Sequence, residues 1–450
     1  MHQMTIGEAV RAVRGTLCAP GLTGEAVFRG ITIDSRRVQA GDMFVPIVGE
    51  RFDGHEFLPQ AFDSGAVIAL AHRDVGFAHI RVEDTTQAFL DLAEYYRSTL
   101  RARVIAVTGS VGKTTTKELI CAALSRSLHV QKSAGNLNNQ TGVPITLFTI
   151  GDAHDAAVVE MGTNHFGEIA RIAKAGRPNI CVFTNIGDAH IEFLGSREGV
   201  LRAKCEMLPY MAEGGRVIVN GDDPLLARLA RSREGVVTCG FGEECAVRAT
   251  QLRPMGLQGS RFSLRWSGGE LEAEVGAPGD HMVLNALLAF AVGLELGVDP
   301  ARCAEGILSY RPEFGRMRVV RTGGVTVLDD VYNANPTSVK ASLDILARAD
   351  GRKVAVLGDM LELGAEGARY HREVGEYAVR LGVDCIIAVG EHAEDVCAPA
   401  NGALETHRFA DREALLAALG ALVRPGDTVL VKASRGLALE GVVAALENGV

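Results

Sequence analysis

The sequence lacks the patterns that mark several well-known classes of protein. Its nine cysteines are scattered, and no two of them form a C-x-x-C pair, so neither a disulfide framework nor a zinc finger is indicated. We therefore expect free thiols in a reducing compartment. No G-x-G-x-x-G occurs anywhere in the chain, which argues against a nicotinamide or flavin cofactor.

Basic charge and long apolar runs are also in short supply. There are 46 basic and 55 acidic residues, a net charge of −9, which gives no support for binding to nucleic acid or to anionic membranes. The N-terminus has no basic segment followed by an apolar one, and the most apolar run, Val283 to Val298, is too short to span a bilayer. We expect a cytoplasmic protein without membrane insertion, and a monomer.

What the chain does contain is typical of an α/β protein. Its 450 residues are 47% hydrophobic and 22% charged, with 52 glycines, so two or three domains with many tight turns are expected. We predict domains at residues 1–100, 101–313 and 314–450. The stretch from Tyr310 to Gly324, which carries proline, glycines and four arginines, is the expected change of domain. After it, strands and helices alternate, which predicts a doubly wound, Rossmann-like parallel sheet.

A glycine loop lies between a predicted strand, Val104 to Val107, and a predicted helix that begins at Lys117. Glycines at 109 and 112 allow backbone N–H groups to converge on an anion, and the lysine that follows supplies positive charge. Threonine hydroxyls after that lysine can bind magnesium. The pattern departs from G-x-x-x-x-G-K-[ST] only at Val107, which replaces its first glycine. The predicted phosphate site comprises Gly109, Ser110, Val111, Gly112, Lys113, Thr114 and Thr115.

Polar side chains follow two further predicted strands. Glu160 ends the strand that begins at Ala156, and His190 follows the strand Asn179 to Ile186. Since the carboxyl ends of parallel strands meet at one edge of a sheet, Glu160 is placed to hold magnesium and His190 to share that edge. The loop Gly135 to Gly142 is rich in amides, which suit a polar substrate but are equally ordinary loop chemistry.

Two other groups of residues leave the choice between function and structure open. Polar groups follow the predicted strands Ala26 to Ile33 and Met43 to Val48, namely Ser35 and Arg36 after the first and the run from Arg51 to His55 after the second. They suit a ligand or a solvated turn equally well. Lys204, on a helix predicted from Arg197 to Leu208, would normally be solvated.

Motifs along all three parts of the chain resemble one family. They are DSR at Asp34, DGHEF at Asp53, TGSVGKTTTKE at Thr108, GNLNNQTGVP at Gly135, EMGTNHFGEI at Glu160, TNIGDAHIEFLGS at Thr184, AKCE at Ala203, GRM at Gly315, DDVYNANPTS at Asp329 and GDMLELG at Gly358. The chain thereby resembles the Mur ligases of bacterial peptidoglycan synthesis. It is most similar to those that join D-alanyl-D-alanine to UDP-N-acetylmuramoyl-tripeptide.

The resemblance implies a fold and a reaction. It implies an N-terminal UDP-substrate domain, a central ATPase domain with a parallel sheet and phosphate loop, and a C-terminal Rossmann-like acceptor domain. It also implies ATP-dependent formation of an acyl phosphate, attacked by the acceptor amine. Lys113 and Thr114 would hold ATP phosphates and magnesium, and Glu160 and His190 would serve two Mg²⁺ ions. Lys204 would be carbamylated by carbon dioxide and become an oxygen ligand of the second ion.

Further roles are implied by the same resemblance. Asn285 matches the adenine-binding asparagine, although His281-Met282-Val283-Leu284-Asn285 has methionine where H-N-x-x-N has its first asparagine. Arg316 and Asp330 are expected at the nucleotide. Implied contacts with the UDP substrate are Ser35, Arg36, Asp53, Gly54, His55, Asn138 and Asn139, and implied acceptor contacts are Tyr332, Asn333, Asn335, Lys432, Ser434 and Arg435.

Two alternatives compete with this interpretation. One is the sister ligase that adds meso-diaminopimelate or lysine to the UDP-linked dipeptide. Its diaminopimelate form carries D-N-P-R, which this chain lacks, and usually G-D-R-D where this chain reads Gly358-Asp359-Met360-Leu361. The other is a non-catalytic nucleotide-binding module, which would not need Glu160, His190 and Lys204 together.

Overall fold

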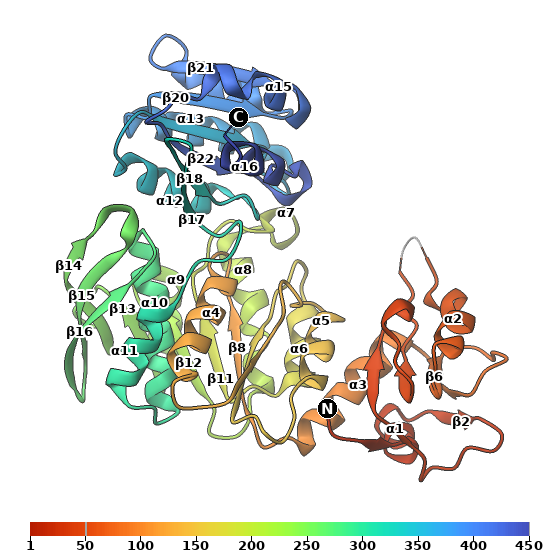
Figure 1. Cartoon of the computed structure of the whole chain (residues 1–450). Coiled ribbons are helices and arrows are strands. Elements are labelled where there is room, and N and C mark those ends of the chain that lie inside the picture. Colours follow the sequence, from red (N-terminus) through yellow and green to blue (C-terminus); the bar gives the residue numbers. More distant parts are fainter. Residues whose placement is uncertain (50–51, 450) are drawn as a thin grey trace. The chain divides into compact units, whose positions relative to one another are not determined.

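The computed structural model describes residues 1–49 and 52–449, which form two compact units. The first comprises Met1–Thr108, Ser127–Val182 and Ala203–Val217, and the second comprises Gly109–Arg126, Phe183–Arg202 and the chain from Ile218 onward. Three larger β-sheets carry helices around them (Figure 1), and the predicted three-domain α/β fold is confirmed. The predicted boundaries at residues 100 and 313 remain predictions.

The N-terminal part contains a two-stranded ribbon and a five-stranded sheet in the order β2-β7-β6-β5-β4. The strands β4 to β7 are parallel, and β2 joins them antiparallel at the edge. Thr5 and Glu8 cap the first helix reciprocally and so fix where it begins. The strands are β1 (Met4–Thr5), β2 (Thr16–Cys18), β3 (Val27–Phe28), β4 (Gly30–Thr32), β5 (Asp42–Phe44), β6 (Ile68–Ala71) and β7 (His79–Arg81), and the helices are α1 (Ile6–Val13), α2 (Leu58–Asp63) and α3 (Thr85–Thr99).

Two strands predicted in this part are shorter than expected. The predicted strand Ala26 to Ile33 is divided at Arg29 into β3 and β4, which belong to different sheets. The predicted strand Met43 to Val48 is reduced to β5, followed by Val45 and then Pro46. Proline has no N–H to donate to a neighbouring strand, which accounts for the early end.

The central sheet has nine strands in the order β16-β15-β14-β13-β12-β11-β8-β10-β9. Its strands are β8 (Arg103–Thr108), β9 (Val130–Lys132), β10 (Ala156–Glu160), β11 (Ile180–Phe183), β12 (Arg216–Asn220), β13 (Val236–Gly240), β14 (Val247–Pro254), β15 (Ser260–Trp266) and β16 (Gly269–Val275). The helices are α4 (Lys113–Leu124), α5 (Gly142–Phe148), α6 (Glu168–Gly176), α7 (Ile191–Leu194), α8 (Arg197–Cys205), α9 (Pro224–Ser232), α10 (Asp280–Glu295) and α11 (Pro300–Ser309).

Strand direction explains how this sheet builds a site. β10 pairs in parallel with β8 and with β9, and Glu160 lies opposite Val107. The carboxyl end of β10 therefore lies beside the carboxyl end of β8, as predicted. Beyond β13 the sheet changes character, because β14, β15 and β16 pair antiparallel. This confirms the antiparallel excursion expected between Gly240 and Val275.

The C-terminal sheet has the order β17-β18-β22-β19-β20-β21 and is parallel except for β17. Alternate residues of β19 enter different cores: Val354 and Val356 pack with α15 and α16, and Ala355 and Leu357 pack with α12 and α13. The sheet is thus covered on both faces, as a doubly wound fold requires. Its elements are β17 (Arg318–Thr322), β18 (Val325–Asp329), β19 (Lys353–Gly358), β20 (Cys385–Val389), β21 (Glu405–Phe409), β22 (Thr428–Lys432), α12 (Pro336–Ala347), α13 (Gly367–Arg380), α14 (Ala393–Cys397), α15 (Arg412–Leu422) and α16 (Glu440–Glu447).

The stretch from Tyr310 to Gly324, where a change of domain is expected, is partly regular structure. Arg318 to Thr322 forms β17, which pairs with β18 and begins the C-terminal sheet. Gly323 and Gly324, with φ of 53° and 84°, form the two-residue turn of this hairpin. The second half of the stretch thus belongs to the C-terminal sheet, and the expected change of domain remains a prediction.

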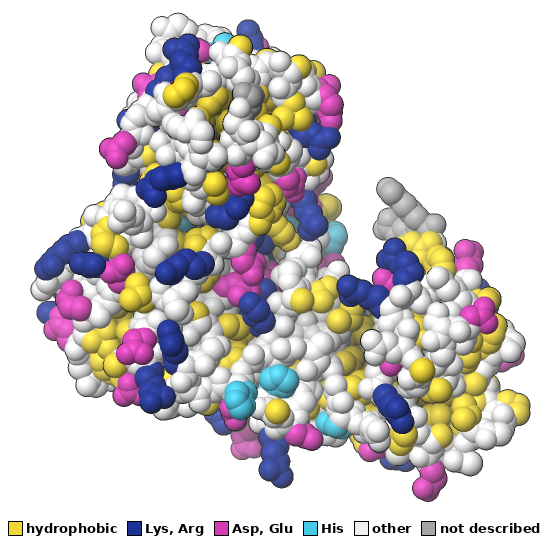
Figure 2. Space-filling model, viewed as in Figure 1, with side chains coloured by type: hydrophobic (Ala, Val, Ile, Leu, Met, Phe, Trp, Pro, Cys, Tyr) yellow, Lys and Arg dark blue, Asp and Glu magenta, His cyan; other side chains and the backbone are white. Residues whose placement is uncertain are grey.

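The surface and the helices add two observations. Figure 2 shows basic and acidic side chains interspersed over the face in view. Within residues 1–49 and 52–449, every helix is too short or too polar to cross a lipid bilayer.

Candidate active site

The glycine loop joins β8 to α4, which begins at Lys113 and not at Lys117 as predicted, and the backbone of the loop is held from one side. Thr184 Oγ1 donates a 2.5 Å hydrogen bond to Val111 O. The Asn185 side chain brackets the same residue, with Oδ1 3.0 Å from Val111 N and Nδ2 3.0 Å from Val111 O. Ser110 Oγ accepts a 2.9 Å hydrogen bond from the N–H of Gly187. The loop is therefore preorganised by the segment that follows β11.

Close packing explains the glycines. Gly109 has φ of 152°, and a Cβ there would lie 1.9 Å from Thr184 Oγ1. Gly112 has φ of 82°, and a Cβ there would lie 3.3 Å from Asn285 Oδ1. Asn285 is buried on α10 and thus lies against the loop. Its predicted role in binding adenine remains a prediction.

Lys113 is the first residue of α4 and curls back over the loop. Its Nζ donates a 3.0 Å hydrogen bond to Gly109 O. Thr114 is buried and Thr115 is half-buried in the same first turn. A helix N-terminus with a lysine over it attracts anions, because unpaired N–H groups and positive charge converge there. The predicted phosphate-binding residues thus lie together on one loop and one helix start.

Glu160 lies in the other compact unit, at the carboxyl end of β10, and is buried. Asn138 Nδ2 donates a 2.8 Å hydrogen bond to Glu160 Oε1, and Ser133 Oγ accepts a 3.1 Å bond from Glu160 N. Asn138 therefore orients the carboxylate. Asn139 binds the backbone instead, since its Oδ1 accepts hydrogen bonds from the N–H groups of Thr141 and Gly142 at the start of α5.

Lys204, on α8, is only 2% exposed. A solvated lysine, the ordinary interpretation of its helical position, is therefore ruled out. His190 precedes α7 with a left-handed backbone, φ 58°, and its Nδ1 lies 2.7 Å from Glu362 Oε2. Glu362 belongs to the GDMLELG motif but carried no prediction of its own.

A buried ion pair joins two predicted residues of the C-terminal sheet. Lys432 Nζ lies 2.5 Å from Asp330 Oδ2 and donates a 3.0 Å hydrogen bond to Asn333 O. Ser342 Oγ donates a 2.7 Å bond to the same Asp330 oxygen. Asp330, predicted at the nucleotide, and Lys432, predicted at the acceptor, thus form one cluster at the ends of β18 and β22.

Aromatic and arginine residues lie beside that cluster. The Arg316 guanidinium stands 3.5 Å from the centroid of the Tyr332 ring, and the Arg435 guanidinium stands 5.4 Å from it. Arg316 also donates a 3.0 Å hydrogen bond to Thr114 Oγ1. Ser434 Oγ accepts from Leu361 N at 2.9 Å. The predicted nucleotide and acceptor residues of this region are thus close neighbours.

Asn335 serves the backbone. It caps α12 reciprocally with Ser338, which satisfies N–H groups at the start of that helix. The asparagine therefore has a structural function besides the predicted acceptor contact.

The predicted UDP-substrate residues fall on two short 3-10 turns. Arg36 folds back on Asp34 with two hydrogen bonds of 2.9 and 2.8 Å, and this arginine holds the pKa of Asp34 at about 2. Ser35 is buried, and its hydroxyl donates to Gln60 at 2.7 Å. The serine thus points inward, while Arg36 is well exposed.

The second turn is built around a buried histidine. Asp53 Oδ1 lies 2.6 Å from His55 Nδ1, and Asp53 Oδ2 lies 2.8 Å from Arg73. Burial acts to raise the pKa of Asp53, but the bonds from His55 and the positive charge of Arg73 outweigh it and give about 2. Gly54 has no room for a side chain, since a Cβ would lie 2.7 Å from Ile47 N. Arg51, which began the predicted polar run, lies outside the described residues.

Sequence reasoning gave no role to Thr184 and Asn185, although both hold the phosphate loop. The signal was present, because both open the TNIGDAHIEFLGS motif. Their contact with the loop depends on the folding of β11 beside β8, which residue spacing alone does not reveal.

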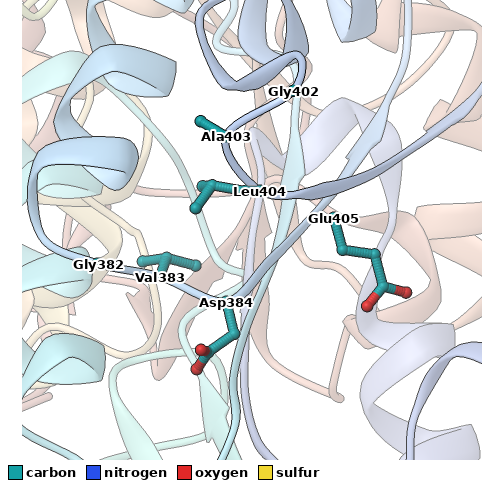
Figure 3. Close-up of a pocket in the computed structure, with 7 residues that line it drawn as sticks. All are labelled: Gly382, Val383, Asp384, Gly402, Ala403, Leu404 and Glu405. Atoms are coloured by element: carbon teal, nitrogen blue, oxygen red, sulfur yellow. The ribbon is translucent and has the colours of Figure 1, made fainter.

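One open hollow lies away from all these residues. Its volume is about 460 Å³, and it is lined by the turns that lead into β20 and β21, from Gly382 to Asp384 and from Gly402 to Glu405 (Figure 3). These are the amino ends of the strands, whereas Asp330 and Lys432 lie at carboxyl ends. The hollow is therefore separate from the predicted site.

Three known protein-family domains match this chain and together cover most of it. Residues 27–111 match the Mur ligase family catalytic domain, residues 107–293 the Mur ligase middle domain, and residues 315–435 the Mur ligase glutamate ligase domain. The UDP-N-acetylmuramoyl-tripeptide–D-alanyl-D-alanine ligase of Escherichia coli (strain K12) is 36% identical, with all of both chains covered.

Solved structures agree with this. MurF from Acinetobacter baumannii superposes with a TM-score of 0.93 at 32% identity, covering 100% of this chain and 99% of that one. MurF ligase from Thermotoga maritima in complex with ADP gives 0.83 at 29% identity, covering 94% and 97%. At 36% identity along its full length with a known member, this protein belongs to the Mur ligase family.

Proposed function

We propose that this protein joins D-alanyl-D-alanine to UDP-N-acetylmuramoyl-tripeptide with consumption of ATP, releasing ADP and phosphate. The observation that carries the proposal is the full-length similarity to ligases of that activity, 36% identity over all of both chains for the E. coli protein. The cytoplasmic location expected from the sequence belongs to the same proposal.

The reaction has two steps. A terminal carboxylate oxygen of the tripeptide attacks the γ-phosphorus of ATP, which breaks the bond to the bridging oxygen and releases ADP. The amine of D-alanyl-D-alanine then attacks the resulting acyl phosphate, the amide bond forms, and phosphate leaves while the amine loses its proton. Two anions must approach in the first step, so positive charge and N–H donors fixed in advance lower the barrier.

Residues of the glycine loop fit the triphosphate. Gly109 and Gly112 let the loop pack against Thr184 and Asn285, and the N–H groups at the start of α4 would bind phosphate oxygens. Lys113, which now donates to Gly109 O, can turn its ammonium to the phosphates without moving the backbone. These residues would bind ATP and offset the charge that develops on its oxygens.

Magnesium and a lysine carbamate are further parts of the proposal. Thr114 and Glu160 supply the hydroxyl and carboxylate oxygens that Mg²⁺ prefers, and Asn138 already orients the carboxylate. Lys204 is buried as a residue modified by carbon dioxide would be, and its carbamate would add oxygen ligands. His190 would contribute at the second ion. Bound Mg²⁺ would stabilise negative charge on the transferred phosphoryl group.

The remaining residues are assigned to the UDP-linked substrate and to the acceptor. Arg36 and Asp53 would meet the UDP-sugar end, with Ser35, Gly54 and His55 shaping their turns. Asn138 and Asn139 would lie along the substrate, and Lys432 and Arg435 would carry positive charge toward the acceptor carboxylate.

The test is phosphate release from ATP in the presence of Mg²⁺ and UDP-N-acetylmuramoyl-tripeptide. We expect release with D-alanyl-D-alanine, little with single amino acids, and a product heavier by one dipeptide less water. Release that instead requires the UDP-linked dipeptide with diaminopimelate or lysine would assign the sister activity. Nucleotide binding without acceptor-dependent release would leave only a binding module and would overturn the proposal.

A further inference from the structure

A histidine with an unused ring nitrogen lies in the N-terminal sheet, in a group of residues that the proposed function does not use. His79 is the first residue of β7 and is 3% exposed. Its Nδ1 lies 2.9 Å from Phe77 O. Because a carbonyl oxygen can only accept, Nδ1 carries a proton, and in the neutral ring the lone pair is on Nε2. That Nε2 is buried and has no hydrogen-bond partner within the described part of the chain.

Two further donor atoms converge on this nitrogen. Cys18, at the end of β2, is the register partner of His79 across the antiparallel pair, so both side chains project from the same face of the sheet. Asp74, in the loop that leads to β7, brings a carboxylate oxygen to 4.0 Å from Nε2. The sulfur, the nitrogen and the carboxylate oxygen all lie within 4.8 Å of one another.

We propose that Cys18, Asp74 and His79 form a binding site for Zn²⁺ or a similar borderline divalent cation, independent of the ligase reaction. Sulfur, imidazole and carboxylate are the ligands that zinc takes, whereas Mg²⁺ and Ca²⁺ select oxygen alone. A carbonyl-bound Nδ1–H with a free Nε2 is the tautomer found in metal-binding histidines.

Geometry and charge are compatible with this assignment. Zinc ligands stand about 2.0–2.3 Å from the metal, so the three donor atoms would have to draw together by roughly 1 Å. Cys18 is half-buried and Asp74 is well exposed, and both can adjust while His79 stays fixed. A thiolate and a carboxylate balance the two positive charges of the cation. Arg81 lies 2.5 Å from Asp74 Oδ1. Arg81 and the cation would then share the carboxylate of Asp74.

In two other clusters of possible metal ligands, a ring nitrogen is already in contact with the carboxylate of the cluster. His55 uses Nδ1 on Asp53, and its Nε2 accepts a 3.4 Å bond from the N–H of His72. His407 uses Nε2 on Glu405, whose other oxygen is taken by Arg352. The lone pair of His79 sets its cluster apart from both.

The cation is expected to cross-link the edge strand β2 and the loop before β7 to strand β7. Only three side chains supply ligands, so a water molecule would complete a four-coordinate site. Binding releases the thiol proton and should therefore weaken as the pH falls. A ligand that binds only the folded chain also raises the midpoint of thermal unfolding.

The test is titration of the metal-free, full-length protein with Co²⁺, in a phosphine reductant that does not chelate metals. We expect saturable binding of one ion with the near-ultraviolet charge-transfer absorption of a cobalt–thiolate bond, and displacement of Co²⁺ by Zn²⁺. Ions held by carboxylates and phosphates at a nucleotide site produce no such band.

Three variants and one control decide the assignment. Cys18→Ser should abolish the thiolate band, and Asp74→Asn and His79→Gln should weaken Co²⁺ binding by about tenfold or more. Cys245→Ser, which removes another half-buried thiol, should leave the band unchanged. Since His79 is buried and its variant could misfold, the decision rests on the two cysteine variants. A wild-type protein without the band, or a band that persists in Cys18→Ser, overturns the proposal.

Discussion

Asn138 donates a 2.8 Å hydrogen bond from Nδ2 to Oε1 of Glu160, so an amide in a loop fixes a buried carboxylate at the end of a strand. If Glu160 holds magnesium, this bond orients a metal ligand. We expect Asn138→Leu to raise the Mg²⁺ concentration for half-maximal activity by about 10- to 100-fold. Activity measured across a magnesium series checks this. Asn136→Leu, at an exposed position of the same loop, is the control, and an equal effect of both variants would contradict the role.

Lys204 offers a test of the proposed carbamate. Lys204→Ala should lower turnover by at least about a hundredfold, because a group that organises charge at the reacting phosphoryl would be lost. Acetate or formate, which are small enough to occupy the vacated space, should restore part of the activity. Lys174→Ala, at an exposed lysine paired with Glu94, should keep normal turnover. Full activity of Lys204→Ala would exclude the assignment.

Gly109 should tolerate no side chain. In Gly109→Ala the new Cβ meets Thr184 Oγ1, so the loop must move away from the segment after β11 that positions it. We expect a loss of about 1–3 kcal/mol in the free energy of unfolding and loss of ATP binding. Urea denaturation and calorimetric titration with ATP measure the two effects. Gly151→Ala meets nothing within 4 Å and should change stability by no more than about 0.5 kcal/mol.

The Asp330–Lys432 pair should be costly to break. Lys432 is 2% exposed, so Lys432→Met leaves a carboxylate without its partner in a largely buried site. We expect a loss of about 3–5 kcal/mol in the free energy of unfolding. Lys340→Met, which breaks a half-exposed pair with Glu373, should cost less than about 1 kcal/mol. Equal losses in urea denaturation would show that burial of the pair does not matter.

Acid should destabilise the protein through His371. Burial lowers the pKa of this histidine from 6.5, and the neighbouring His392 lowers it further. The hydrogen bond to the carbonyl of Gly367 raises the pKa but does not outweigh them. The neutral ring accepts a 2.8 Å bond from Met360 N, which protonation would break. Below pH 6.5 the unfolded chain binds more protons than the folded one. The free energy of unfolding therefore decreases as the pH decreases, by up to about 1.4 kcal/mol per pH unit.

The variant His371→Gln removes this titration and should flatten the dependence. Urea denaturation at pH 7.5, 6.5 and 5.5 supplies the comparison, with His129→Gln as a control at an exposed position. If His371→Gln loses stability on acidification as steeply as the unmodified protein, another group is responsible.

The parts of the site that depend on nearby residues could be predicted from the sequence. Gly109, Gly112 and Lys113 lie within five positions, and their geometry follows from one strand, one turn and one helix start. The position of Glu160 could be predicted because this residue ends a short apolar run. In a parallel sheet, the carboxyl end of such a strand lies at the same edge as the phosphate loop. Local rules sufficed for both.

The parts that depend on distant residues could not be predicted from spacing. Asp330 and Lys432 stand 102 positions apart and meet because β18 and β22 are neighbours in the sheet. The run of arginines around Arg318 gave no sign of a strand, whereas in the folded chain Arg318 opens β17 and pairs with Asp329 and Glu447. Asn139 and Asn335 show the converse limit, since an amide that caps a helix and one that binds a substrate look the same in a sequence.

The hairpin that opens the C-terminal sheet is completed by the last helix of the chain. Arg318 contacts Glu447 at 2.5 Å, and Thr322 Oγ1 donates a 2.8 Å hydrogen bond to Glu447 O. The first strand of this domain therefore gains these two contacts only when α16 packs beside it. The stability of the hairpin and that of α16 should therefore be coupled, although most of the sequence of the domain lies between them.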